Sequence, residues 1–286
     1  MSLDLRTPAS TRESSPGHRR ARVLRIGAAV ADRLSGDAGT IGRVHSVFGR
    51  ALNIETLDGR LLTLHGPGPL RAPFAAVIDR LALLRAQRPG APVAVEPGRL
   101  RLPGLTLEWG GATRVECTIP GPPPGLHRSV VDILRAFDPR RAPALDTPRG
   151  VAARAALSAA IVSGAPRALV SAARALLGLG EGLTPAGDDC LVGALAVVRA
   201  IAGPAMVGAP AVARVVAHEA LHRTTALGRE FVIEALAGRF SEPVLGLLRA
   251  RSADAAAAAA RALAGLGATS GADTLTGMRL ACGAFA

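Results

Sequence analysis

The first 119 residues consist of short apolar runs separated by turn residues, which is the pattern of a β-rich domain. Residues 51–57 and 60–64 flank Asp58-Gly59, and this pair predicts a β-hairpin because both turn positions favour positive φ. Two other segments, 23–34 and 73–85, carry apolar residues at every third or fourth position and predict helices. The remaining predicted strands cover residues 40–48, 93–96, 99–102, 105–109 and 114–119.

The second half of the chain predicts helices. Residues 120–126 read PGPPPGL, and proline interrupts both helices and strand ladders, so we expect a linker here. Alanine dominates the residues after this linker; it is the best helix former and lets helices approach closely, which favours a compact bundle. The predicted helices cover residues 127–137, 150–163, 166–177, 189–202, 210–222, 225–238, 241–251, 253–265 and 273–284.

These patterns together predict an α+β protein. We expect a disordered polar leader over residues 1–20, a β-rich N-terminal domain over 21–119, the linker over 120–126, and an all-α bundle over 127–286. The apolar stretch 191–216 contains Arg199 and Arg214 as well as two prolines, so we interpret it as a buried helix pair and not a membrane span.

Composition and charge exclude several classes of protein. The formal net charge is +12, but all the basic residues are arginines spread along the chain and aromatic residues make up 2%, which argues against nucleic-acid binding. Three widely spaced cysteines exclude a disulfide framework and a CxxC zinc site. No signal peptide is visible, so we expect a cytoplasmic protein with neither a membrane nor a nucleic acid as partner.

The most informative segment is GLGEGLTPAGDD, residues 178–189, which lies between two predicted helices. Its glycines permit positive φ and let backbone N–H groups approach a ligand. A second segment resembles it, since G-x-D-x-L-x-G occurs at 187–193 and at 271–277, offset by 84 positions (271 − 187). We expect the two loops to meet in space and to bring Asp189 and Asp273 together.

Converging carboxylates beside hydroxyl groups suit a hard cation such as Mg²⁺, with Asp189 and Asp273 as its ligands. They also suit the N–H donors of an amide or ureido substrate, and a carboxyl beside another can have a raised pKa and transfer protons. The candidate catalytic residues are therefore Asp188, Asp189 and Asp273. The alternative is structural, because glycine loops often only end helices and aspartates often only cap them.

The segment GLGEGLTPAGDD resembles the signature of the AllH-like family, whose named member is a subunit of oxamate carbamoyltransferase. His45-Ser-Val-Phe48 with Ala51-Leu-Asn53, His222-Arg-Thr-Thr225 and Thr269-Ser-Gly-Ala-Asp273 are similar to other parts of that family, so the resemblance spans about residues 22–284. The chain departs from the expected pattern at Glu181, Ala186 and Cys190. The negative charge of Glu181 would repel a phosphate on this loop unless a cation or an arginine intervenes.

The resemblance implies a transferase subunit of ureide and purine catabolism that assembles with other enzyme subunits. The implied reaction exchanges a carbamoyl group between oxalurate and phosphate. Acyl transfer develops oxyanion charge, which preorganised N–H groups or arginines stabilise. The candidate substrate-binding residues are Gly180, Gly182, Thr184, Gly187, Arg223, Thr224, Thr225, Ser270, Gly271 and Asn53.

Other functions stay open from the sequence. The chain could be an all-helical Mg²⁺-dependent hydrolase, since its aspartate motifs faintly resemble those of ADP-ribosylglycohydrolases, or a non-catalytic subunit that binds a partner. His45 and His222 are possible acid–base groups, with packing and helix-dipole roles as the alternatives. Cys190 is a poor nucleophile, because Asp188 and Asp189 beside it would raise the pKa of its thiol.

Overall fold

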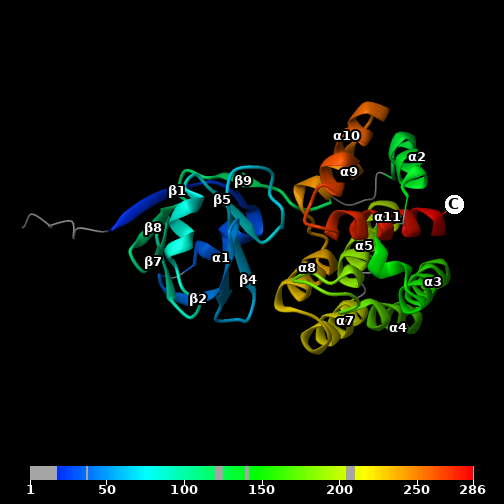
Figure 1. The fold of residues 1–286 in the computed structure, drawn as a ribbon, viewed down its shortest axis with the longest axis horizontal. Helices are drawn as coiled ribbons and strands as arrows, with labels where there is room; N and C mark the ends of the chain where they lie inside the picture. The colour runs from blue at the N-terminus through cyan, green and yellow to red at the C-terminus, as the bar shows by residue number, and fades with distance from the viewer. Residues whose placement is uncertain (1–17, 37, 120–124, 139–141, 204–209, 286) are drawn as a thin grey trace, which may run out of the picture.

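The structure, a computed structural model, describes residues 18–36, 38–119, 125–138, 142–203 and 210–285. It has a barrel-like β-sheet at the N-terminal side and a helical half at the C-terminal side (Figure 1). The predicted α+β class is therefore confirmed. Most of the expected leader, residues 1–17, and most of the expected linker, residues 120–124, lie outside the described residues.

Nine strands form one sheet in the order β5-β4-β3-β2-β6-β7-β8-β1-β9. Strand β1 pairs with β8 and β9 on one side and with β5 on the other, so the sheet closes on itself. Small closed barrels fill their interior with side chains, and here the interior residues form one hydrophobic core. The strands are β1 (Arg19–Gly27), β2 (Gly39–Val47), β3 (Ala51–Thr56), β4 (Leu61–His65), β5 (Ala75–Ile78), β6 (Pro92–Glu96), β7 (Arg99–Leu102), β8 (Leu105–Glu108) and β9 (Thr113–Val115).

Two helix predictions in this half are corrected. Residues 73–85 were expected to form one helix, but they contain strand β5, buried along its whole length, and the 3₁₀ helix η1 (Leu81–Ala86). Residues 23–34 divide between the end of β1 and helix α1 (Ala28–Leu34). Strand β5 is buried and apolar at every position, so its sequence cannot be told from a short helix, whereas at 23–34 the apolar residues of the strand end continue directly into those of α1.

The predicted hairpin and the predicted helices of the second half are confirmed to within a few residues. Strands β3 and β4 pair across Asp58-Gly59, and Gly59 has a φ of 73°. The helices have their own hydrophobic core, separate from that of the barrel. They are α2 (Arg128–Ala136), η3 (Pro143–Asp146, 3₁₀), α3 (Pro148–Ser163), α4 (Pro166–Leu176), α5 (Ala186–Ala202), α7 (Pro210–Arg223), α8 (Ala226–Leu236), α9 (Glu242–Arg249), α10 (Ala253–Ala264) and α11 (Ser270–Ala284).

Helix α8 joins the helical half to the barrel. The ring of Phe231 meets that of Phe74 edge-on, with 4.9 Å between the ring centres. Arg60, beside the hairpin turn, donates to both oxygens of Glu230 at 2.9 and 3.0 Å and also bonds Glu234. Glu230 is fully buried, so this ion pair fixes the position of the barrel against α8.

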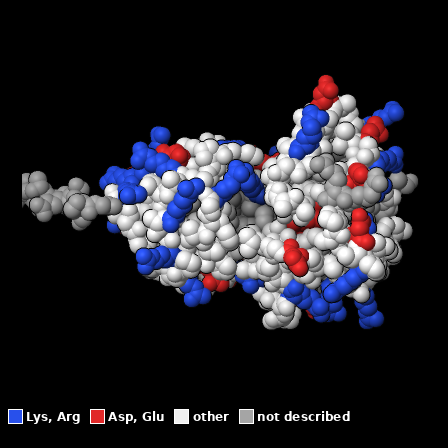
Figure 2. All heavy atoms as spheres, viewed as in Figure 1, with Lys and Arg blue, Asp and Glu red and all other residues white. Residues whose placement is uncertain are grey.

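No helix among the described residues is long and apolar enough to cross a membrane. The arginines on the visible face are scattered over both halves and do not gather in one patch (Figure 2).

Candidate functional site

The two matching glycine–aspartate segments meet where helices α5 and α11 cross. A Cβ added to Gly193 of α5 would lie 2.0 Å from the carbonyl oxygen of Thr274. A Cβ added to Gly277 of α11 would lie 1.9 Å from the carbonyl oxygen of Cys190. The contacts correspond, since Gly193 matches Gly277 and Cys190 matches Thr274 in the aligned segments. Only glycine permits this approach, and the expectation that the two segments meet is confirmed.

The glycines that open the two segments also correspond. A Cβ on Gly187 would lie 2.0 Å from the carbonyl oxygen of Leu176, and one on Gly271 would lie 1.9 Å from that of Leu263. Each glycine therefore lets its helix start against the end of the preceding helix. The N–H of Gly187 donates to Leu179 O at 2.8 Å and that of Gly271 to Leu266 O at 3.0 Å, so neither amide is free to bind an anion.

Asp189 and Asp273 occupy the same place at the two helix starts. Both are buried, with exposed fractions of 7% and 1%. Oδ2 of Asp189 and both carboxylate oxygens of Asp273 have no hydrogen-bond partner among the described residues. The hydroxyls of Thr184 and Ser270, one from each loop, lie 2.8 Å apart and link the two loops beside these carboxyls.

This arrangement disfavours two negative charges. Burial raises the pKa of Asp189 well above its ordinary range, and the charge of Asp273 raises it further, while the Ser270 and Thr184 hydroxyls partly offset the rise. Burial also raises the pKa of Asp273 to about 6. Raised pKa values favour the protonated forms of both carboxyls, which is the property that a proton donor or acceptor needs.

Asp188 has a different environment from its neighbour. It accepts a hydrogen bond from the N–H of Gly178 at 2.9 Å and another from the hydroxyl of Thr224. Burial raises its pKa to about 6, although these two bonds favour the ionised form. Asp188 therefore ties the loop to the chain just before α8.

Asp189 lines a cleft of about 680 Å³ between the barrel and the helical half. The barrel side contributes Arg50, Arg71 and Asn53, and the helical side contributes the two loops and the segment after α8. The surface is hollowed where the two halves meet (Figure 2). A polar ligand in this cleft would touch both halves of the chain.

The structure brings six of the predicted site residues to this cleft. They are Asn53, Gly182, Thr184, Asp189, Ser270 and Gly271. Asn53 is held in place, since its Nδ2 donates to Ser46 at 3.1 Å and its Oδ1 accepts from Thr63 at 2.7 Å. Asp188, Asp273, Gly180, Gly187, Arg223, Thr224 and Thr225 do not line the cleft.

Three of those residues have structural partners instead. Arg223 is exposed and donates to Glu219 at 2.6 Å, one turn earlier on α7. Thr224 bonds Asp188, and Thr225 caps α8 by accepting from the N–H of Gly228 at 2.9 Å. His45 and His222 are exposed and do not line the cleft either.

Sequence reasoning missed the arginines of the cleft. Arg50 and Arg71 are exposed and form no hydrogen bond or ion pair with a described residue, whereas Arg239 is bonded to Glu234. Arg50 lies between the resembling residues Phe48 and Ala51, which is the one signal that could have identified it. These arginines face the same cleft as Glu181 and can offset its negative charge.

Two further sequence-based predictions concern Cys190 and a metal ion. Cys190 is fully buried, and burial raises the pKa of its thiol to about 12, so the thiolate nucleophile is disfavoured as expected. No group of three or more His, Cys, Asp or Glu side chains in the described part of the chain is placed to hold a metal ion. The Mg²⁺ assignment to Asp189 and Asp273 stays a prediction.

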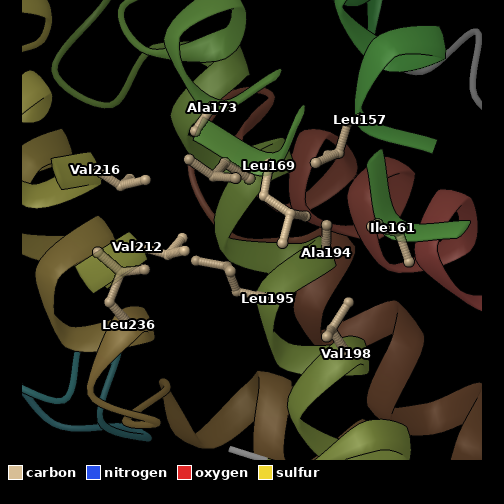
Figure 3. A pocket seen from close by; sticks show the side chains of 11 residues that line it. Leu157, Ile161, Leu169, Ala173, Ala194, Leu195, Val198, Val212, Val216 and Leu236 are labelled. Carbon is tan, nitrogen blue, oxygen red and sulfur yellow. The ribbon is translucent and has the colours of Figure 1, made fainter. Parts of the chain in front are cut away.

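A second hollow in the helical half is apolar. It is a void of about 20 Å³ with aliphatic walls, among them Leu169, Leu195 and Val212 (Figure 3). It offers no polar group that would orient a substrate, so the cleft is the better candidate site.

Comparison with known families agrees with this geometry. Residues 22–114 match the AllH family N-terminal domain, and residues 176–282 match the oxamate carbamoyltransferase subunit AllH. The chain belongs to the AllH family. The first match runs from within β1 to within β9, and the second contains both glycine–aspartate segments. No curated protein and no solved structure matched the chain.

Proposed function

We propose that the chain is a subunit of a cytoplasmic oxamate carbamoyltransferase of ureide and purine breakdown, and that its cleft binds the ureido or carbamoyl substrate. One observation carries the proposal. The cleft has one wall from each of the two regions that match the family, and it is lined by a buried carboxyl, one oxygen of which has no hydrogen-bond partner in the described part of the chain. We further propose that these regions are two domains, residues 21–119 and 127–286.

The reaction needs a group that moves a proton. A phosphate oxygen attacks the terminal carbamoyl carbon of oxalurate, and the bond from that carbon to the inner nitrogen breaks. Carbamoyl phosphate forms, and the nitrogen leaves as the amide of oxamate after gaining a proton. Hydrogen phosphate loses its proton in the attack, and this proton returns to the group that protonated the nitrogen. The reaction therefore takes up and releases no net proton.

The Asp189–Asp273 pair suits this step. Asp189 lines the cleft, whereas Asp273 does not, and burial raises the pKa of both carboxyls, which favours their protonated forms. Asp189 is the proton donor to the leaving nitrogen in the proposal, and Asp273 is a positioning residue that keeps the pKa of Asp189 high. Asp188 acts only by holding the loop through Gly178 and Thr224.

The charges across the cleft favour one orientation of the substrate. Arg50 and Arg71 on the barrel side are suited to the carboxylate of oxalurate or to phosphate, since guanidinium groups bind both by paired hydrogen bonds. Asp189 on the helical side would accept the ureido N–H groups. The carbamoyl group of oxalurate, which is the group transferred, then lies against the glycine loops.

Ligand binding is tested by thermal unfolding of the isolated chain with oxalurate, oxamate or carbamoyl phosphate. A ligand at about ten times its Kd stabilises the folded state by about 1.4 kcal/mol. For a chain of this size, about 1 kcal/mol corresponds to a Tm rise of about 2–4 °C. The absence of any shift with all three ligands would refute the proposed substrate class.

Catalysis is tested in the complex that copurifies with the tagged chain, by following carbamoyl phosphate formation from oxalurate and phosphate. Asp189→Asn should lower kcat by about 100-fold or more, because it removes a general acid. The matched control is Asp254→Asn, which changes an exposed aspartate on α10. Full activity of Asp189→Asn would remove Asp189 from the mechanism while leaving the family assignment intact.

A further inference from the structure

A second polar hollow lies at the other end of helix α11. It measures about 510 Å³ and is lined by residues of α2, α3 and the C-terminal half of α11. Helix α11 starts at the cleft with Ser270 and reaches this hollow at Thr276–Gly283. Figure 1 shows these three helix segments on the side of the helical half that faces away from the barrel. The hollow is therefore separate from the cleft.

Its lining is basic. Three helices each contribute one arginine, namely Arg135 from α2, Arg154 from α3 and Arg279 from α11. The hydroxyl residues Ser158 and Thr276 also line it. No aspartate or glutamate is among the described residues of the lining.

The arginines are poorly neutralised. Arg135 and Arg279 form no hydrogen bond or ion pair with any described residue, and both are exposed. Arg154 is largely buried and binds Asp146 at 3.0 Å through one terminal nitrogen, but its Nε is buried without an acceptor among the described residues. Arg43 and Arg174, by contrast, pair with Glu55 and Glu219 on the surface.

Like charges that gather around a concave surface and outnumber their counter-charges create a local potential that attracts anions, and here only Arg154 has an acidic partner among the described residues, Asp146. Guanidinium groups also match the geometry of oxyanions, to which they can donate paired hydrogen bonds. A volume of about 510 Å³ lies within the range of small-molecule sites. The hollow thus has the charge, the donors and the size for an oxyanion group with an attached moiety.

We infer that the hollow formed by Arg135, Arg154 and Arg279 is an anion-binding site, distinct from the cleft, for a phosphoryl or carboxylate group. The inference does not depend on the carbamoyltransferase proposal. The site takes a small free anion, whose oxygens accept hydrogen bonds from the three guanidinium groups.

Binding is measured by calorimetric titration of the full chain with sodium phosphate and with sodium succinate, at ionic strength held constant with sodium chloride. The double variant Arg135→Gln/Arg279→Gln should weaken binding of the preferred anion by about a hundredfold, because each of the two charged hydrogen bonds that it removes is worth about tenfold. Both residues are exposed, so the variant should keep the wild-type unfolding midpoint. Tighter binding of phosphate identifies a phosphoryl site, and tighter binding of succinate identifies a carboxylate site.

Two controls separate this site from general charge and from the cleft. Arg167→Gln removes an exposed arginine of α4 that has no partner among the described residues and lies outside the hollow, and it should leave the affinity unchanged. Arg50→Gln/Arg71→Gln removes the arginines proposed to bind anions in the cleft, so it should abolish only anion binding at the cleft, and binding at the hollow should persist in this background. The inference is overturned if neither anion binds, or if Arg135→Gln/Arg279→Gln binds as tightly as wild type.

Discussion

Gly277→Ala adds one methyl group at the closest approach of helices α5 and α11. The new Cβ would lie 1.9 Å from the carbonyl oxygen of Cys190, whereas ordinary contacts of a Cβ are 3.4–4 Å. The neighbouring atom belongs to the backbone of a buried helix, so no side-chain rotation can relieve the overlap. The two helices must move apart, and this separates the starts that carry Asp189 and Asp273.

Two opposing effects determine how much Gly277→Ala changes the free energy of unfolding. Alanine is favoured over glycine inside a helix by about 1 kcal/mol. Overpacking of a tightly packed contact costs about 1–3 kcal/mol, and a clash with backbone belongs at the upper end of that range. The expected net result is a loss of about 2 kcal/mol in the free energy of unfolding. With a urea m-value of about 2 kcal/mol per molar, the midpoint falls by about 1 M.

The assay is urea unfolding followed by two signals. Far-UV circular dichroism reports mainly the helices, and the fluorescence of Trp109, the only tryptophan, reports the barrel. The matched control is Gly283→Ala in the same helix, where a Cβ would have no neighbour within 4 Å, so its midpoint should stay the same or rise. If Gly277→Ala is as stable as Gly283→Ala, the close crossing of α5 and α11 is refuted.

The remaining predictions concern charge. Asp273→Asn should raise the free energy of unfolding by about 1–3 kcal/mol at pH 8 and by little at pH 4, measured by urea unfolding at both pH values. Burial raises the pKa of Asp273 from 3.8 to about 6, so the wild-type carboxyl is protonated at low pH and its ionisation destabilises the fold as the pH rises through 6. A gain in stability at pH 4 alone would contradict this reasoning. Arg60→Met should lower the free energy of unfolding by about 3–5 kcal/mol, because it leaves Glu230 buried without its counter-charge. Arg43→Met, at an exposed pair, should lower it by about 1 kcal/mol or less, and equal losses in the two variants would contradict the interface. The predicted Mg²⁺ assignment is tested by thermal unfolding at pH 7. If Asp189 and Asp273 bind the cation, Mg²⁺ should raise the Tm and Asp189→Asn should abolish the rise, whereas an unchanged Tm would refute the assignment.

Local patterns determined much of the fold. Alanine-rich periodic segments predicted the helices of the second half, and Asp58-Gly59 predicted the hairpin, since both signals act within a few residues. The repeated G-x-D-x-L-x-G pattern predicted that Asp189 and Asp273 meet. That prediction reached across 84 residues because the glycines needed for a close helix crossing are themselves visible in the sequence.

Other contacts between distant segments depend on the tertiary structure and could not be predicted from the sequence. The apolar run at 75–78 became a strand because it is buried between β1 and β4 when the barrel closes, and its own sequence does not distinguish that place from a helix. Arg50 and Arg71 reach the cleft because the barrel docks against α8, whereas Arg223 at the end of α7 pairs with Glu219 outside the cleft. The sequence determined which segments form helices and which glycines allow close packing. Only the tertiary structure decided which arginines lie around each hollow. The charge of an arginine and its spacing along the chain do not predict which residues become its neighbours in the fold.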